Sequence, residues 1–263
     1  MSPRVLVVVP TYNEKESIPG ALARLLEHVP GADVLVVDDA SPDGTGPLVE
    51  QIAADERAAG VARTVTVLHR SGKQGLGAAY VAGFGWALER DYDVVVEMDA
   101  DGSHRAQDLP ALLAAVPDAD LVLGSRWVPG GEVVNWPKNR EVLSRGANTY
   151  TRLLLGIPVH DATGGFRAYR ADLLRELQLV DVASRGYCFQ IDMTLRSLRA
   201  GARVVEVPIT FVERELGASK MSRDIVVEAL LKVTGWGMAE RSRQVAGAFR
   251  KVTGRGVEHP ARH

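Results

Sequence analysis

The chain has 263 residues, of which 46% are hydrophobic and 24% charged, which is the balance of a globular protein with one large domain or one domain plus an appendage. Its formal net charge of -2 gives no overall field that would attract nucleic acid. The single cysteine, Cys188, excludes an internal disulfide and is expected to be a buried apolar residue. Because the sequence has neither a signal-peptide pattern nor a run of about 18 apolar residues, we expect a cytosolic chain.

Apolar runs alternate with helical patterns along the chain. The expected strands cover residues 4–9, 34–37, 65–68, 94–98 and 120–124, and the expected helices cover residues 13–29, 47–59, 75–88 and 109–116. The first helix is expected to open at Asn13 with a capping box, and the small residues of the third predict a close approach of its backbone to the sheet or a ligand. Near-continuous apolar strands separated by helices predict an α/β fold with a mostly parallel sheet covered on both faces.

Acidic residues follow three of these strands. Asp99 and Asp101 end the fourth strand, Asp38 and Asp39 end the second, and Glu14 follows the first. Because ligands bind outside the carboxyl ends of parallel strands, we expect these acids to line one edge of the sheet. Two carboxylates one residue apart suit a hard divalent cation that also binds substrate phosphates. The same residue types occur in solvated turns and helix caps, so the pattern alone leaves those interpretations open.

Ordered segments of the chain resemble a known enzyme family. They read VVVPTYNE, VVDDASPDGT, GLGAAYVAGF, VVEMDADGSH, GSRW, TGGFRAYR, GYCFQIDM and FVERELGASKMS. From about residue 4 to residue 237 the chain resembles the polyprenol-phosphate mannose synthases, which are similar to dolichol-phosphate mannose synthases within glycosyltransferase family two. The resemblance implies a Rossmann-like nucleotide-sugar-binding fold of the glycosyltransferase A type, with a catalytic domain over residues 1–237 and an amphipathic, basic tail over residues 238–263.

The resemblance also implies an activity. The donor would be GDP-mannose, the acceptor a polyprenyl monophosphate of the dolichyl type, the cofactor Mg²⁺ or Mn²⁺, and the product an inverted β-mannosyl phosphoryl polyprenol for downstream mannosylation. Expelling a nucleoside diphosphate requires cations in a dry site, whereas the acceptor phosphate is already anionic at pH 7 and needs no general base. A related transferase that uses UDP-glucose or another donor is the second hypothesis, and a non-catalytic sugar-nucleotide-binding protein is the third.

Roles for individual residues follow from the same resemblance. The metal ligands would be Asp99, Asp101 and Ser103. The donor site would comprise Pro10, Tyr12, Glu14, Val37, Asp39, Asp99, Ala100, Asp101, Arg126, Arg167, Arg214 and Lys220. The acceptor phosphate would meet Arg126, Arg140 and Ser144, and the catalytic residues would be Asp99, Asp101, Arg126, Asp192 and Arg214.

Some of these roles have alternatives. Ser103 stands where relatives often carry a longer glutamine, which weakens the argument for direct ligation, and the adjacent His104 is a less favoured ligand of a hard ion. Asp192 could orient mannose hydroxyls, act as a base or serve only as an acid early in a helix. The glycine-bearing segment 215–219 is expected to form a lid over the donor.

Two amphipathic stretches bear on the lipid acceptor. Apolar residues with basic neighbours occur over residues 140–155 and 225–249, and such stretches can lie in an anionic membrane interface or pack on the sheet. With no spanning segment in the sequence, we expect peripheral association with the cytoplasmic face of a membrane, or a separate membrane-anchoring protein.

Overall fold

A central sheet with the strand order β3-β2-β1-β4-β7-β5-β8 organises the computed structural model, which describes residues 3–177, 179, 187–213 and 231–238. The strands are β1 (Val5–Thr11), β2 (Asp33–Asp38), β3 (Val65–His69), β4 (Val94–Glu97), β5 (Leu121–Ser125), β6 (Glu132–Val134), β7 (Arg167–Arg170), β8 (Val204–Pro208) and β9 (Thr210–Val212). The α-helices are α1 (Ile18–His28), α2 (Thr45–Ala58), α3 (Leu76–Leu88), α4 (Leu109–Ala115), α5 (Lys138–Leu155), α6 (Ala171–Glu176) and α7 (Tyr187–Arg199). Two 3₁₀ turns, η1 (Ala106–Asp108) and η2 (Val116–Asp118), flank α4.

The sheet is mostly parallel, which confirms the predicted fold class. Strands β3, β2, β1 and β4 run parallel to one another, and β8 runs parallel to β5. Strand β7 lies between β4 and β5 and is antiparallel to both. The parallel pairing of β1 with β2 and with β4 brings the carboxyl ends of these three strands to one edge, as the sequence predicts.

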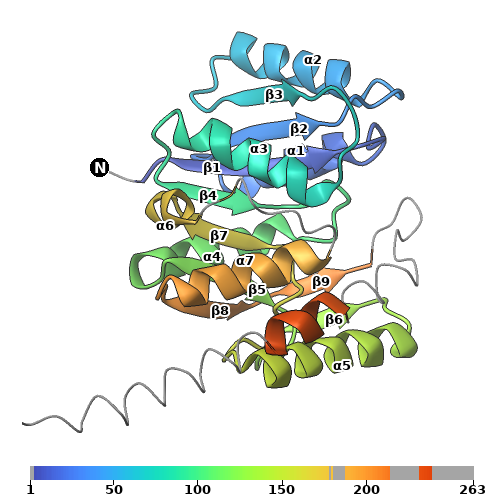
Figure 1. The fold of residues 1–263 in the computed structure, drawn as a ribbon. Coiled ribbons are helices and arrows are strands. Elements are labelled where there is room, and N and C mark those ends of the chain that lie inside the picture. The colour runs from blue at the N-terminus through green and yellow to red at the C-terminus, as the bar shows by residue number, and fades with distance from the viewer. Residues whose placement is uncertain (1–2, 178, 180–186, 214–230, 239–263) are drawn as a thin grey trace, which may run out of the picture.

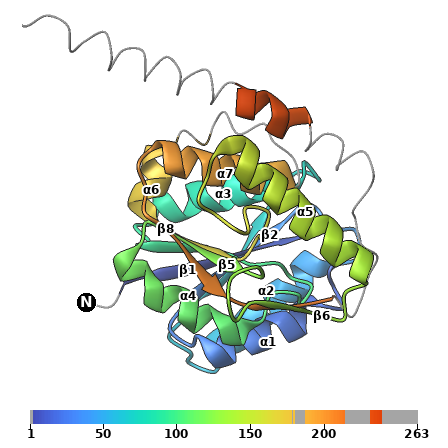
Figure 2. The same ribbon diagram turned by 90° about the horizontal axis from the view of Figure 1, so that it is seen from below.

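Alternate residues of the strands supply two hydrophobic cores. Leu6 and Val8 of β1 join the core under α3, α6 and α7, whereas Val7 and Val9 join the core under α1, α2 and α4. Figures 1 and 2 show these two helical layers on opposite faces of the sheet. Burial on both faces explains why the strand sequences are continuously apolar.

The first helix begins later than its capping-box pattern predicts. It starts at Ile18, and no side chain of the described residues caps its N-terminus. Asn13 instead adopts a left-handed backbone conformation with φ of 58°. The main-chain N–H of Asn13 binds the hydroxyl of Ser41, and that of Lys15 binds the carboxylate of Asp43. Residues 13–17 therefore form a loop, and its Asn13 and Lys15 N–H groups hold it against the segment that follows β2.

Helix α3 approaches the sheet closely, as its small residues predict. A β-carbon at Gly83 would lie 2.4 Å from Cγ1 of Val8, too close for any side chain. Glycine at this position therefore allows the helix to rest directly on β1.

Helix α5 lies outside the sheet layers and packs against the helical residues 231–238 (Figure 1). The hydroxyls of Tyr150 and Thr234 are 2.8 Å apart, and Gly237 faces Leu154. Among the described residues, we find no helix that combines the length and the hydropathy needed to cross a bilayer.

Candidate active site

The loop after β4 presents the acidic pair at the edge of the sheet. The side chain of Asp99 is 32% exposed, and its Oδ1 accepts a hydrogen bond from the hydroxyl of the buried Tyr80 at 3.2 Å. Burial, followed by the charge of Asp99, raises the pKa of Tyr80 well above its usual value, so this hydroxyl remains a donor. The Oδ1 of Asp101 accepts the main-chain N–H of Ser103 at 3.0 Å. The buried Oγ of Ser103 has no hydrogen-bond partner among the residues that the structure describes.

His104 lies directly behind this loop. Its side chain is 2% exposed, and its Nδ1 accepts the main-chain N–H of Asp99 at 3.0 Å. Its Nε2 lies 3.8 Å from Oδ2 of Asp99.

A buried polar network connects β4 to α7. Gln190 donates from Nε2 to the carboxylate of Glu97 at 2.7 Å, and both residues are buried. Burial raises the pKa of Glu97 to about 7, against the opposing effects of Arg167 and the Gln190 amide. Asp192, two residues after Gln190 on α7, is also buried and accepts a 2.9 Å hydrogen bond from Nε of Arg196.

Arg167 belongs to this network, which corrects the expectation that it binds a donor phosphate. Its side chain is completely buried, and its guanidinium donates to the carbonyl oxygens of Ala162, Gly164 and Gln190 at 2.8–2.9 Å. It also donates to the hydroxyl of Thr194 at 3.0 Å. Arg167 therefore joins the loop before β7 to α7, and its guanidinium has no access to a phosphate in the described structure.

The ends of β1 and β2 form the predicted nucleotide side. The ring of Tyr12 is half-buried, and Nζ of Lys73 lies 4.2 Å from its centre. Asp39 is buried and forms a 2.6 Å ion pair with Arg70. Because it pairs with the guanidinium of Arg70, the Asp39 carboxylate is oriented toward the loop that leads into α3.

The other residues predicted at this side differ in exposure. Pro10 and Glu14 are half-buried, and Val37 is completely buried in β2. The carboxylate of Glu14 accepts a hydrogen bond from the hydroxyl of Ser17 at 2.8 Å.

Asp38 has a structural role within the acidic edge. It is buried, and its oxygens accept hydrogen bonds from the hydroxyls of Thr11 and Ser41 and from the main-chain N–H of Ser41. This carboxylate therefore joins the ends of β1 and β2.

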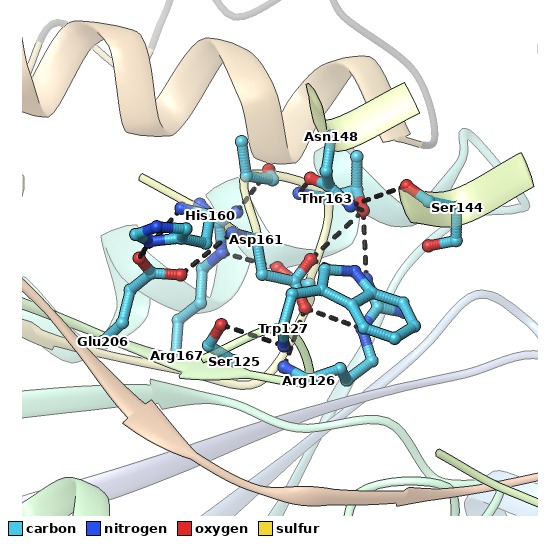
Figure 3. A network of polar contacts seen from close by, with 12 residues as sticks. Ser125, Arg126, Trp127, Ser144, Asn148, His160, Asp161, Thr163, Arg167 and Glu206 are labelled. Atoms are coloured by element: carbon cyan, nitrogen blue, oxygen red, sulfur yellow. Dashed lines mark hydrogen bonds and ion pairs between the residues drawn. The ribbon is translucent and has the colours of Figure 1, made fainter. Parts of the chain in front are cut away.

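A buried ion pair organises the opposite side of the site (Figure 3). Arg126, which follows β5, donates from Nε and Nη2 to the two carboxylate oxygens of Asp161, each at 2.7 Å, and Asp161 also accepts the Arg126 main-chain N–H. Nη2 further contacts the hydroxyl of Thr163 at 3.0 Å. Burial raises the pKa of Asp161, but the Arg126 guanidinium outweighs that effect and leaves the pKa below its ordinary value.

Aromatic rings surround the predicted acceptor arginines. The Arg126 guanidinium lies 5.4–5.5 Å from the ring centres of Trp127, Trp136 and Phe211. Arg140 lies over Trp136 at 4.1 Å and pairs with the carboxylate of Glu213.

Ser144 lies one turn beyond Arg140 on α5, and its carbonyl accepts the side-chain amide of Asn148. Ser144 and Arg126 are thus linked through their neighbours, because Asn148 also donates to Thr163, whose hydroxyl contacts Arg126.

Comparison with protein families decides what kind of protein carries this site. The family model described as glycosyl transferase family 2 matches residues 6–178. The chain belongs to this family. A glycosyl transferase family 2 domain agrees with the acidic pair at the edge of a mostly parallel sheet.

Two curated proteins are similar to this family 2 transferase over most of their length. An undecaprenyl-phosphate mannosyltransferase of Micrococcus luteus is 59% identical over 238 residues, covering 90% of this chain and 96% of that protein. A polyprenol monophosphomannose synthase of Mycolicibacterium smegmatis is 54% identical over 248 residues, covering 94% of this chain and 92% of that protein.

A solved structure shares the fold of the family 2 transferase. Glucosyl-3-phosphoglycerate synthase from Mycobacterium tuberculosis, in complex with Mn²⁺, UDP-glucose and phosphoglyceric acid, superposes with a TM-score of 0.61 at 19% identity. The superposition covers 89% of this chain and 80% of that chain. This neighbour supports the predicted glycosyltransferase A-type fold.

Several positions of the family 2 transferase lie outside the described residues. They are Arg214, Lys220, the expected lid over residues 215–219, and the tail over residues 239–263. The roles of Arg214 and Lys220, and the domain boundary after residue 237, therefore stay predictions.

Three other residues that contact the predicted site residues are not predicted from the sequence. Tyr80, Arg70 and Asp161 contact predicted site residues that lie 19, 31 and 35 positions away in the chain. Tyr80 lies within the GLGAAYVAGF segment, but its small neighbours point to backbone packing, and nothing in the spacing of Arg70 or Asp161 indicates a partner.

Proposed function

We propose that this family 2 transferase moves mannose from GDP-mannose to a polyprenyl monophosphate with inversion, giving β-mannosyl phosphoryl polyprenol. The observation that carries the proposal is 59% and 54% identity, over nine-tenths or more of the chain, to proteins named for mannosyl transfer to such lipids. The donor GDP-mannose is consistent with those names.

We infer a Mg²⁺ or Mn²⁺ site at Asp99 and Asp101, with Ser103 as a third ligand. The donor set is all oxygen, as a hard cation prefers, and the buried Oγ of Ser103, which no described residue contacts by a hydrogen bond, fits a ligand. Within the described part of the chain, no three His, Cys, Asp or Glu side chains gather tightly enough to hold a metal alone. This agrees with an ion that takes two carboxylates and completes its shell with substrate phosphates. When bound, such an ion neutralises the charge that develops on the departing diphosphate.

The residues of the acceptor side bind and orient the nucleophile. A phosphate monoester is already anionic, so the site must position it and needs no base. Arg140 pairs with the carboxylate of Glu213 in the described structure, and this pairing supports its proposed role as an anion-binding residue. An acceptor phosphate would replace that carboxylate. Asp192 faces Arg196, so we propose that it orients a mannose hydroxyl rather than removing a proton.

The direct test is a donor and acceptor matrix. Purified protein is incubated with Mg²⁺ or Mn²⁺, a polyprenyl phosphate and labelled GDP-mannose, UDP-glucose or GDP-glucose. We expect labelled lipid only with GDP-mannose, and the product should be labile to mild acid. Label transferred from UDP-glucose instead would replace the proposal with the second hypothesis, and no transfer from any donor would favour a non-catalytic binding protein.

We also propose peripheral binding to the cytoplasmic face of a membrane through α5 and the helix at residues 231–238. Apart from Val61 and Leu76, every exposed large hydrophobic side chain of the described residues lies on these two helices. They are Val142, Leu143, Tyr150, Leu153, Leu231 and Met238. Arg145 and Arg152 lie on the same helix α5, as a surface that meets anionic lipid requires.

Replacing Leu153 and Leu231 by glutamate should weaken binding to phosphatidylglycerol vesicles by about tenfold or more, because burial of each side chain in lipid is worth roughly 1.5–3 kcal/mol. Co-sedimentation measures this binding. Transfer to a short, water-soluble prenyl phosphate should be unchanged, because both side chains are about two-thirds exposed. Val61→Glu, on the α2–β3 loop, is the matched control. Vesicle binding equal to that of the unmodified protein would contradict the proposed surface.

A further inference from the structure

The hydrogen bond between Asp99 and His104 fixes where the imidazole carries its proton. The main-chain N–H of Asp99 can only donate, so Nδ1 of His104, 3.0 Å away, must be an unprotonated acceptor. The proton of the neutral ring therefore lies on Nε2. An imidazole in this state has no lone pair to offer a metal from Nε2, and its Nδ1 lone pair is already engaged.

Both carboxylate oxygens of Asp99 face a donor from the protein. Tyr80 donates its hydroxyl to Oδ1 at 3.2 Å, and the Nε2–H of His104 lies 3.8 Å from Oδ2. The second distance is too long for a hydrogen bond but short enough for electrostatic attraction to favour one carboxylate orientation. Donors behind a ligating carboxylate commonly set its direction and its basicity.

The His104 ring is itself held rigidly. It stacks on Phe166 with ring centres 5.0 Å apart and planes at 9°, and it meets the edge of Phe211 at 5.6 Å. A backbone bridge joins His104 to Phe211, and the carbonyl of Ser103 accepts the N–H of Val212 at 3.2 Å. These contacts connect the acidic loop to Phe166, the residue before β7, and to β9, and they restrict rotation of the imidazole.

We propose that His104 is a positioning residue that, with Tyr80, orients the Asp99 carboxylate for the divalent ion and its bound diphosphate, and that His104 is not itself a ligand. The inference rests on the proposed function only in requiring such an ion. Neither His104 nor Tyr80 is among the residues proposed to contact substrate.

The test measures Mn²⁺ binding in the presence of GDP by electron paramagnetic resonance, without any transfer reaction. His104→Phe keeps the stacking on Phe166 but removes both nitrogens, and should weaken Mn²⁺ binding by about 10- to 100-fold. His104→Asn places an amide oxygen near the position of Nδ1, and should retain most of the affinity by accepting the Asp99 N–H. Tyr80→Phe should weaken binding by a smaller factor.

The outcomes separate this proposal from its alternatives. His104→Phe with the affinity of the unmodified protein, even at a lower melting temperature, would leave the histidine a purely structural role. Equal losses in the asparagine and phenylalanine variants would show that an acceptor for the Asp99 N–H does not restore the site, and would overturn the proposal. If the unmodified protein binds no Mn²⁺ with GDP, the metal part of the proposed function fails first, and this proposal fails with it.

Nitrogen-15 spectra of histidine-labelled protein give a second, independent readout. The His104 signals, assigned by their loss in His104→Asn, should show a neutral ring protonated at Nε2 both before and after addition of Mg²⁺ and GDP. A ring protonated at Nδ1, or a large shift of the Nε2 signal on metal addition, would contradict the assigned tautomer and role.

Discussion

Asp101→Asn should reduce mannosyl transfer by about 1,000-fold or more, since a metal that stabilises a leaving group contributes several kcal/mol to the barrier. The amide keeps an oxygen that can accept the N–H of Ser103, so the turn after β4 should survive. What the variant loses is the negative charge that binds the ion. Initial rates at increasing Mg²⁺ or Mn²⁺ concentration measure the effect, and the melting temperature should change little.

Asp118→Asn is the matched control for Asp101→Asn. It makes the same chemical change at an exposed residue of η2, and transfer should be unaffected. A fully active Asp101→Asn enzyme would show that this carboxylate does not bind the metal. An inactive enzyme that has also lost its melting transition would call for Asp99→Asn as the second variant, because the Asp99 side chain accepts a hydrogen bond from Tyr80 of α3, which an amide oxygen can also accept.

The sequence predicts the parallel half of the sheet well for a physical reason. Strands buried on both faces must be apolar throughout, so β1, β2 and β4 appear as unbroken runs in the sequence. Strand β7 has no such run, because its four residues RAYR begin and end with arginine. Its antiparallel place between β4 and β5 is decided by tertiary pairing, which no local pattern records.

Some residues of the site can likewise be predicted from the sequence, and others cannot. Asp99 and Asp101 can be placed from sequence because parallel strands end together, so residues at strand ends converge. Arg167 could not be placed from sequence, because an arginine shortly after two glycines suits a phosphate and a set of buried carbonyl groups equally well. Only the structure shows that its guanidinium donates hydrogen bonds to main-chain carbonyl oxygens. Asp161 lies in a loop, and its partner Arg126 is 35 residues away, so its role depends on the completed fold.

Asp161→Asn should destabilise the protein by about 3–5 kcal/mol, because it leaves the buried guanidinium of Arg126 without a counter-charge. At roughly 2–4 °C per kcal/mol for a chain of this size, the melting temperature should fall by about 10 °C. Asp172→Asn is the matched control, since its ion pair with Arg175 is exposed and should contribute at most about 1 kcal/mol. Equal melting temperatures for the two variants would contradict a stabilising role of the buried pair.

The double variant Arg126→Met with Asp161→Leu separates stability from chemistry. Apolar side chains can replace a buried ion pair at little cost, so much of the lost stability should return. Transfer should not return, because we propose that the Arg126 cation acts on the phosphates. A stable and active double variant would remove Arg126 from the proposed site.

The destabilisation caused by Asp161→Asn should depend on pH, because the pKa of Asp161 is lowered in the folded protein. Because the carboxyl pKa of Asp161 is lowered on folding, the unfolded chain binds this proton more readily than the folded protein does. The contribution of Asp161 to the unfolding free energy is therefore present above the ordinary pKa of 3.8 and is lost as the pH falls further. The difference in unfolding free energy between the unmodified protein and Asp161→Asn should therefore be constant above about pH 5 and shrink below about pH 4. Urea unfolding at a series of pH values measures it. A difference that grew on acidification would require a raised pKa, and the Arg126 guanidinium would then not be the dominant influence on this carboxyl.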